Sequence, residues 1–197
     1  MHILKSKTTL LVLVLSSFGL SQHTLGRDVE PIVPMGALAL AAAAVEKDTG
    51  GRILEIRLAD DTGAPAFEAA LTKDGTIVYM RIASPSDDVS EIEVSQLPHW
   101  LQNYQLDAYR RSVSKARVAI DQAITKAEQN DQSPAIDAGI AKPLGGTNAV
   151  LAYFVETIKG GKRNQLAVDA TTGAMIANPE SLYEPHTPVQ LARRLAQ

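Results

Sequence analysis

Few side chains of this 197-residue chain could do chemistry, and two acidic pairs stand out among them. Asp60-Asp61 and Asp87-Asp88 each lie in a stretch that is predicted to be a turn or connection. Carboxylate oxygens are the ligands that Ca²⁺ prefers, but a calcium site needs about six oxygen ligands. Neither pair lies in a loop that offers so many, so we interpret both pairs as solvated turns.

Two histidines, His99 and His186, follow the first 26 residues. They are too few for a histidine-based metal site unless folding adds several carboxylates. His99 lies directly before the single tryptophan, in the stretch LPHWL, and we interpret it as a packing residue. His186 lies in a tail rich in turn-forming residues and is interpreted as solvated.

The common nucleophile and phosphate motifs are missing from the sequence. The chain has no cysteine, and none of its serines lies in a G-x-S-x-G turn. Gly145-Gly146-Thr147 and Gly160-Gly161-Lys162 lack the spacing of a P-loop. We therefore expect a protein that is not an enzyme, with no catalytic residue, no metal site and no cofactor.

One further stretch, VDATTGAMI from Val168 to Ile176, has the composition of a specific turn. Asp169 and Thr172 have side chains that bond their own backbone, and Gly173 supplies a positive φ. We predict a structural turn that lets the chain leave a sheet. A ligand-binding role for Asp169 is the alternative.

Residues 1–26 are predicted to be a signal peptide. Lys5 and Lys7 precede the apolar run TTLLVLVLSSFGL, and small residues precede Arg27. The run is shorter than the roughly 20 residues that span a bilayer. We expect a periplasmic or secreted protein without stable membrane insertion; an uncleaved anchor and cleavage after Ser21 are the alternatives. The absence of cysteine also excludes a lipid-modified N-terminal cysteine.

Charge and cysteine content limit the classes of partner. Removal of Lys5 and Lys7 with the signal peptide leaves 17 basic residues against 22 acidic ones, a net charge of −5. An acidic chain argues against nucleic acid as a partner. With no disulfide available, the domain has to be held together by its hydrophobic core.

The first half of the remaining chain is predicted to form one helix and three strands. Residues 37–48 are rich in alanine and end at Gly50-Gly51, which predicts a helix. Apolar and polar residues then alternate in RILEIRL, FEAALTK and TIVYMRI, and Asp74-Gly75 predicts a tight hairpin. We expect the helix to lie buried on the sheet; an exposed apolar patch that receives a partner is the alternative.

The second half repeats this order. The apolar spacing of Ser112–Asp131 predicts a helix, and PAIDAGIAKP, NAVLAYFVETIK and KRNQLAVD predict three strands. Phe67 and Phe154 fall at matching places in the two halves, 87 residues apart. We therefore predict an α+β fold of two tandem units, each a helix packed on its own three-stranded antiparallel sheet. The units cover residues 35–84 and 112–178, with a connection at 85–111 and a tail at 179–197.

This pattern resembles the PepSY family, small domains of bacterial peptidase propeptides and envelope proteins. AAAAVEKDTGGRILEIRL matches the passage from helix to strand in the first unit, and AYFVETIKGGKRNQLAVDATTGAMI matches the hairpin and closing turn in the second. The first unit departs from the pattern at Ala83–Ser86, where the acidic–Thr–Gly turn is replaced. The second departs at Gln129–Pro134, which lacks the glycine pair.

The resemblance implies binding rather than catalysis. It favours an exported protein that binds a protein partner, with inhibition or regulation of a peptidase as one role. A structural or assembly accessory of the cell envelope is the alternative. A sheet edge is one candidate contact. The aromatic residues Trp100, Tyr104 and Tyr109 of the connection are another, unless they fill the groove between the two units.

Overall fold

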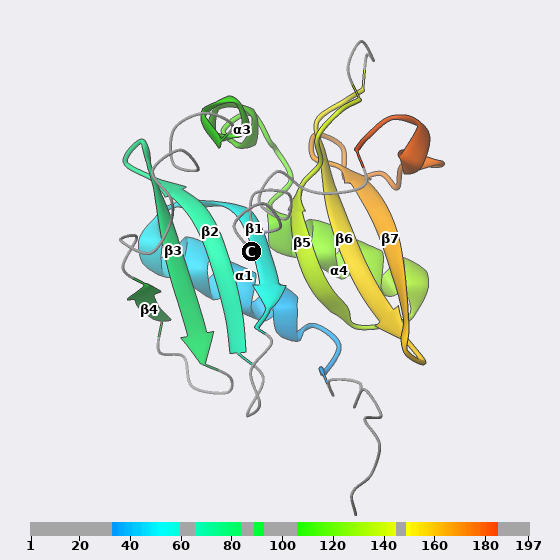
Figure 1. The fold of residues 1–197 in the computed structure, drawn as a ribbon, viewed down its shortest axis with the longest axis horizontal. Coiled ribbons are helices and arrows are strands. Elements are labelled where there is room, and N and C mark those ends of the chain that lie inside the picture. Colours follow the sequence, from blue (N-terminus) through cyan, green and yellow to red (C-terminus); the bar gives the residue numbers. More distant parts are fainter. Residues whose placement is uncertain (1–32, 60–65, 84–88, 93–105, 145–148, 185–197) are drawn as a thin grey trace, which may run out of the picture.

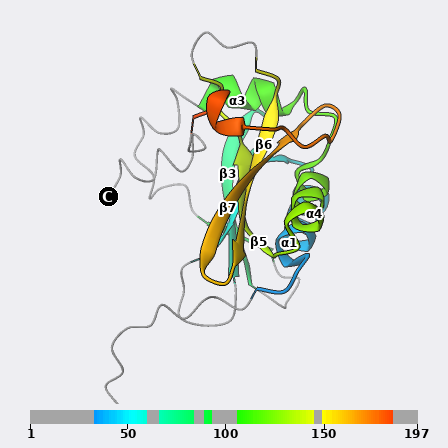
Figure 2. The same cartoon turned by 90° about the vertical axis from the view of Figure 1, so that its right-hand side faces the viewer.

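A computed structural model describes residues 33–59, 66–83, 89–92, 106–144 and 149–184, which form an α+β fold (Figure 1). Seven antiparallel strands form one sheet, in the order β4-β3-β2-β1-β5-β6-β7. Two helices, α1 and α4, cover one face of this sheet (Figure 2). No helix in the described ranges is both long and apolar enough to cross a membrane.

Helix α1, Ala37–Thr49, confirms the helix expected from the alanine-rich stretch. It ends where Gly50 adopts a φ of 66°, a conformation that glycine reaches without the steric cost of a Cβ. Leu38, Ala42 and Val45 are buried against the sheet, as expected. Leu40 points away from it, with 73% of its surface exposed.

The predicted strands of the first unit are β1 (Arg52–Leu58), β2 (Ala66–Lys73) and β3 (Thr76–Ala83). Asp74 and Gly75 join β2 to β3 with φ values of 48° and 78°. Two positive φ values are typical of the type I′ hairpin turn that the Asp-Gly pair predicts. A short strand that the sequence did not predict, β4 (Val89–Ile92), extends the sheet beyond β3.

The second unit has the same order of elements: α4 (Ile120–Asp131), β5 (Ala135–Ile140), β6 (Ala152–Lys159) and β7 (Lys162–Asp169). Gly160 and Gly161 make the turn between β6 and β7, again with two positive φ values. A short 3₁₀ helix, η2 (Pro179–Ser181), follows the last strand.

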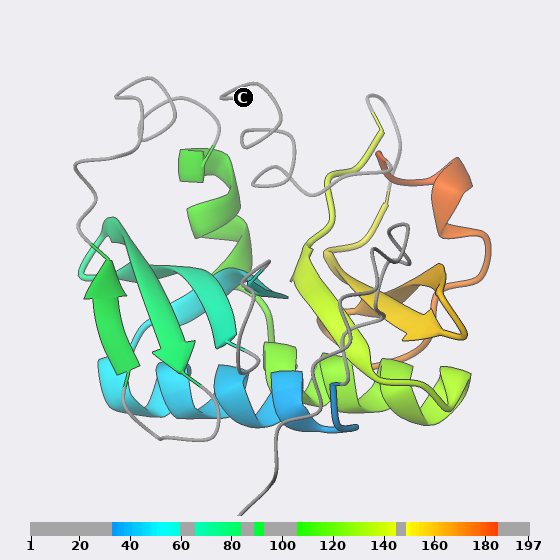
Figure 3. The ribbon, with the colours of Figure 1, turned by 60° about the horizontal axis from the view of Figure 1, so that its bottom comes forward.

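The expectation of a separate three-stranded sheet for each unit is wrong. Strand β1 pairs with β5, and Ile56 lies directly opposite Ala138 at the centre of the combined sheet. Helices α1 and α4 lie next to each other under this junction (Figure 3). Pairing β1 with β5 gives backbone partners to two strands that would otherwise be exposed edges, which explains why the two units merge.

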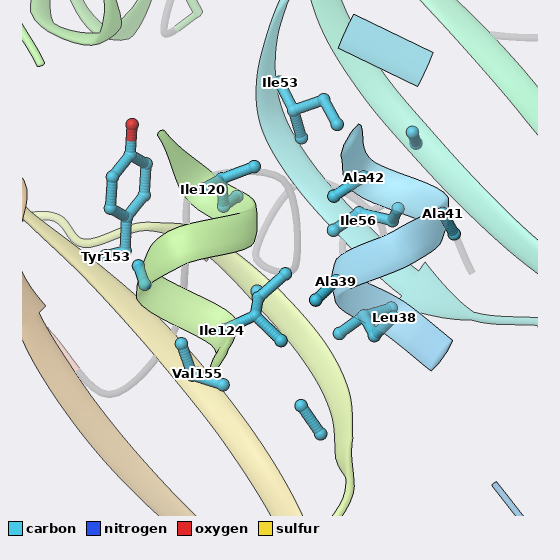
Figure 4. Close-up of a cluster of buried hydrophobic side chains, with 14 of the residues drawn as sticks. Leu38, Ala39, Ala41, Ala42, Ile53, Ile56, Ile120, Ile124, Tyr153 and Val155 are labelled. Carbon is cyan, nitrogen blue, oxygen red and sulfur yellow. The ribbon is translucent and has the colours of Figure 1, made fainter. Parts of the chain in front are cut away.

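The packing between the helices and the sheet shows that the expected match of Phe67 with Phe154 is wrong. Ile56 pairs with Ala69 on β2, and its counterpart Ala138 pairs with Val155 on β6. Phe67 lies two residues before Ala69, and Tyr153 lies two residues before Val155. Tyr153 is therefore the structural equivalent of Phe67. Figure 4 shows Tyr153 and Val155 in the same apolar cluster as residues of α1, α4 and β1.

Phe154 is buried, but on the opposite face of the sheet. A shift of one residue along a strand moves a side chain to the other face. There Phe154 packs edge-on against Tyr183, with ring centroids 5.6 Å apart. These two rings form a small second cluster with Ala141, Ala152 and Ala167.

The helix predicted for Ser112–Asp131 is two helices. Helix α3 spans Leu106–Val113, within and just beyond the predicted connection, and α4 begins only at Ile120. Between them the backbone N–H groups of Arg117 and Val118 both donate to the carbonyl of Ala170, each at 2.9 Å. These bonds to a distant segment replace the helical ones, so tertiary contact overrides the local helical pattern.

Candidate interaction site at the edge of the sheet

The turn at Asp169–Gly173 has the structural role that the sequence predicted. One carboxylate oxygen of Asp169 accepts the N–H groups of Thr171 at 2.7 Å and Thr172 at 3.1 Å. Gly173 has a φ of 73°. Burial opposes ionisation of Asp169, but the bonds from Thr171 and Thr172 outweigh it and lower the pKa of this carboxyl group.

The turn folds the next residues back onto the outer side of β7. The N–H of Asp169 donates to the carbonyl of Ala174, and the N–H of Ile176 donates to the carbonyl of Ala167, both at 2.9 Å. Residues 174–176 therefore cover the end of β7, where an isolated bridge joins Val168 to Met175. Among the described strands, the beginning of β7 is the outer border of the sheet.

At this border the backbone of β7 faces outward. Neighbouring residues of an antiparallel strand direct their N–H and C=O groups to opposite sides. Ala167 and Asp169 direct theirs away from β6, so Arg163, which has the same parity, does so too. Lys162, Arg163 and Asn164 are all exposed. This part of β7 can therefore accept an additional strand.

The hairpin that carries this edge is fixed to the end of α4 by Asp131. Its carboxylate accepts hydrogen bonds from Thr157 at 2.6 Å, from Asn164 at 3.0 Å and from Ser133. The ammonium group of Lys159 donates to its carbonyl at 3.2 Å. Because a rigid edge loses little entropy on binding, this anchoring prepares the strand for a partner.

These bonds change the pKa of Asp131. The hydrogen bonds from Ser133 and Thr157 lower the pKa of its carboxyl group, and burial partly opposes them. Asn164 and the charge of Lys159 lower the pKa further. Asp131 therefore holds the hairpin as a carboxylate.

A row of charged residues crosses the sheet on the face opposite α1 and α4. Successive strands place these side chains directly opposite one another, in the order Arg81, Glu68, Arg57, Asp137, Glu156. Arg57 binds Glu68 at 2.9 Å, and Arg163 of β7 binds Glu156 at 2.7 Å. Cross-strand pairs of opposite charge stabilise a sheet, and the like-charged pair of Asp137 and Glu156 is the exception in this row. We interpret the row as structural, with Arg163 at its outer end.

Of the three aromatic residues predicted to bind a partner, the described residues include only Tyr109. Trp100 and Tyr104 lie outside them. Tyr109 is half-buried on α3, and burial, with a smaller contribution from Glu184, raises the pKa of its hydroxyl to about 12. The guanidinium of the next residue, Arg110, donates to the carbonyl of Gly75. Helix α3 thus contacts the β2–β3 turn, and Tyr109 packs against the main core, which favours a packing role for Tyr109.

The C-terminal segment around Tyr183 packs on the second unit, on the face of the sheet that carries Phe154. The sequence did not predict this contact. The hydroxyl of Tyr183 donates to the carbonyl of Val150 at 2.8 Å, and Lys142 binds Glu184 at 2.8 Å. Its sequence carries no strong strand or helix period, so only the buried tyrosine could have indicated a contact.

The remaining residues considered for chemistry are only partly described. Asp60-Asp61, Asp87-Asp88, His99, His186 and Gly145–Thr147 lie outside the described residues. Gly160-Gly161 is the turn of the β6–β7 hairpin. Within the described ranges, no group of three or more histidine, cysteine, aspartate or glutamate residues is placed to hold a metal ion.

Comparisons with known proteins leave the family open. No family model matches the chain, and no curated protein matches it. A crystal structure of a "putative lipoprotein" from Clostridium difficile 630 is similar over 74% of this chain and 93% of that one. The sequence identity is 14% and the TM-score 0.40, so the likeness carries no argument about function. The PepSY resemblance therefore stays a prediction.

Proposed function

We propose that this chain is an exported, non-catalytic, PepSY-like protein that binds a protein partner through the outer edge of β7. We further propose that the partner is a peptidase of the periplasm or the exterior, which the bound chain inhibits or regulates. The observation that carries the proposal is the exposed first part of β7, anchored to α4 by Asp131. The regulatory role rests on the PepSY resemblance.

An exposed strand edge binds extended polypeptide through main-chain hydrogen bonds. Such strand addition gives affinity from the backbone, and alternate side chains add specificity. Proteins usually protect long edges against unwanted pairing. In this chain residues 174–176 cover one end of β7, and within the described part of the chain Lys162, Arg163 and Asn164 are exposed at its other end.

Two variants of one residue test the edge. Arg163→Pro removes the outward N–H and would obstruct an added strand, while it costs no bond to β6. Arg163→Ala keeps that N–H. Both variants lose the ion pair with Glu156, so the comparison isolates the backbone. We expect Arg163→Ala to capture the same partner from native envelope extract as the unmodified chain, and Arg163→Pro to lose it.

The identity of the captured protein separates the two functional classes. A peptidase in the eluate, with activity reduced by the purified chain, supports the proposed role. An envelope assembly complex without a peptidase supports the accessory role instead. If Arg163→Pro is folded, as judged by its thermal melt, and still captures the partner, the edge of β7 is not the binding site.

A further inference from the structure

A basic stretch joins α3 to the start of α4 (Figure 3). Its sequence from Arg110 to Arg117, RRSVSKAR, holds four basic residues and no acidic one. Four positive charges on a mature chain of net charge −5 leave −9 on the rest of that chain. The stretch therefore runs against the acidic character of the molecule.

Helix α3 is fixed to the fold by its apolar side. Val113 is buried in the core, and Tyr109 and Ala116 pack against the same core. Positions three and four residues apart share one side of a helix. These three residues therefore define the inner side of α3 and of the turn that follows it, whereas Arg111 and Lys115 are exposed.

The backbone keeps a helical path beyond the end of α3. The N–H of Ser114 donates to the carbonyl of Arg110 at 3.4 Å, and the N–H of Lys115 donates to the carbonyl of Ser112 at 3.0 Å. On such a path residues four apart are neighbours, and like charges at this spacing destabilise the helix. Arg111 and Lys115 form such a pair, so an anion bound by both side chains would replace repulsion with attraction.

Three of the basic side chains are available to a partner. Arg110 is engaged, because its guanidinium donates to the carbonyl of Gly75. Arg111, Lys115 and Arg117 are exposed, and within the part of the chain that the structure describes their side chains make no hydrogen bond or ion pair. We call these three residues the basic strip.

The backbone of the basic strip offers no donor to an anion. The N–H groups of Lys115 and Ala116 donate to carbonyls one turn back, and those of Arg117 and Val118 both donate to the carbonyl of Ala170. Small anions are held best where backbone N–H groups converge on them. A partner of the strip therefore has to bring several negative charges to the side chains, as an acidic segment does.

An anionic membrane fits the basic strip less well than an acidic segment. Peripheral membrane proteins combine basic residues with apolar side chains that enter the bilayer interface. The apolar side chains next to the strip, Val113, Ala116 and Val118, pack on the core instead. A second copy fits poorly too, because a two-fold contact centred on the strip would place it against itself, with like charges in contact.

We propose that the basic strip is a docking surface for an acidic segment of a protein partner. Arg111 and Lys115 bind the segment as neighbours on one helical path, and Arg117 extends the contact toward α4. The surface is separate from the edge of β7, so the proposal does not depend on strand addition there.

Two capped peptides, hexaglutamate and hexaglutamine, test the docking surface on the mature chain. An NMR titration follows the backbone amides of Arg111, Lys115 and Arg117, with the amide of Asp131 as a remote reference. We expect hexaglutamate to shift the three strip amides, to leave Asp131 unchanged and to bind at least tenfold more tightly than hexaglutamine. Raising the salt from about 0.02 M to about 0.5 M should weaken this binding at least tenfold.

A matched pair of double variants separates the strip from general charge. Arg111→Gln, Lys115→Gln should bind hexaglutamate at least tenfold more weakly than the unmodified chain. Lys47→Gln, Lys126→Gln removes the same number of charges from other exposed positions and should bind within twofold of it. Basic residues also stabilise the C-terminal end of a helix. A strip variant that melts at a lower temperature but keeps its affinity would limit these residues to that structural role and overturn the proposal.

The remaining outcomes identify other occupants or none. Hexaglutamate shifts confined to residues outside the strip would overturn the proposal. Strip-dependent binding of phosphatidylcholine vesicles with about 30% phosphatidylglycerol, without hexaglutamate binding, would assign the surface to a membrane and overturn it. Self-association that the strip variant abolishes would identify a second copy and overturn it as well. Arg163→Pro should bind hexaglutamate like the unmodified chain, so failure of the β7 edge and failure of the strip are distinguishable.

Discussion

Glu46 and Glu128 make the same hydrogen bond in the two halves of the chain. In each case Oε1 accepts the backbone N–H of the residue seven positions later, Ile53 or Ala135, at 2.9 Å. Both bonds fasten the end of a helix to the start of the strand that follows it. Glu128 additionally accepts the N–H of Gly36 at 3.1 and 3.0 Å, so it also holds the start of α1.

The additional bond makes Glu128 more important for stability than Glu46. Glu128 is 3% exposed, and Glu128→Ala leaves two backbone N–H groups without their acceptor. Each lost acceptor costs about 1–3 kcal/mol, so we expect a loss of about 2–6 kcal/mol in urea unfolding. Glu46→Ala, the matched variant, should cost about half as much. Equal losses would show that the bond to Gly36 contributes nothing.

Asp131 should make stability depend on pH in the acidic range. Its pKa is lowered from the ordinary 3.8 by the bonds from Ser133 and Thr157. The carboxylate therefore stabilises the fold fully above about pH 3.8, and this contribution is lost as the pH falls through the folded pKa. Asp131→Asn should cost about 1–2 kcal/mol at neutral pH, a value reduced by solvent screening. The difference should shrink in melts at lower pH.

Glu46 should depend on pH with the opposite sign, which makes it the control for Asp131. Burial raises its pKa above the ordinary 4.5, although the bond from Ile53 and the charge of Arg52 oppose the shift. Its contribution is present below pH 4.5 and is lost as the pH rises through the folded pKa. Glu46→Gln keeps an oxygen that accepts the N–H of Ile53, but its amide does not titrate. The loss of stability with rising pH should therefore disappear in this variant. A pH profile of Glu46→Gln identical to that of the unmodified chain would contradict the assignment.

Phe67 and Phe154 should both be core anchors, but of different clusters. Either one changed to alanine should cost about 3–5 kcal/mol in thermal or urea unfolding. The contact with Tyr183 distinguishes them. In double-mutant cycles with Tyr183→Ala, Phe154→Ala should show a coupling of about 0.5–1.5 kcal/mol, whereas Phe67→Ala should be additive. A loss below about 1 kcal/mol for Phe154→Ala would contradict its burial.

Local sequence patterns predicted the helices and strands of this fold better than the way in which the strands pair. The alanine-rich run before Gly50 and the pair Asp74-Gly75 encode a helix end and a hairpin within a few residues, and both predictions are confirmed. The pairing of Ile56 with Ala138 joins residues 82 positions apart, and no local pattern encodes it. The face of β6 was missed because both Tyr153 and Phe154 are large and apolar, so the alternation does not decide between them.

In the candidate site, too, the sequence predicted the local turn but not the long-range contacts. Asp169, Thr172 and Gly173 predicted their turn because the side-chain bonds are local. The return of Met175 onto β7 depends on that turn and on an available edge, and nothing in the residues themselves indicates it. The position of β7 at the border of the sheet follows only from the complete strand order.

Export should leave a mature chain that begins near Arg27. Lys5, Lys7 and the short apolar run are typical of a cleaved signal peptide. N-terminal sequencing of the exported protein measures the site directly, and cleavage after Ser21 would move the start by five residues. An intact Met1 in a membrane fraction would show that the segment is an uncleaved anchor.

The aromatic residues of the connection should contribute to stability rather than to partner binding. Tyr109 is half-buried and packs against the main core, and burial, with a smaller contribution from the charge of Glu184, raises its pKa. Trp100 precedes it in the same connection, and we expect both to fill the groove between the units. Trp100→Ala and Tyr109→Ala should therefore lower the melting temperature and leave partner binding intact once the chain is folded.

Binding measurements on the same variants distinguish a packing role from the role of an interface anchor. If Trp100 is an interface anchor, Trp100→Ala should barely change the melting temperature and should weaken partner binding by about 2 kcal/mol or more. Arg163→Pro serves as the reference, because it should abolish binding through the edge of β7 without removing an aromatic side chain. A Trp100→Ala variant that keeps both its stability and its binding would refute both roles for this residue. In that case the outer edge of β7 would remain as the contact surface to which partner binding is assigned.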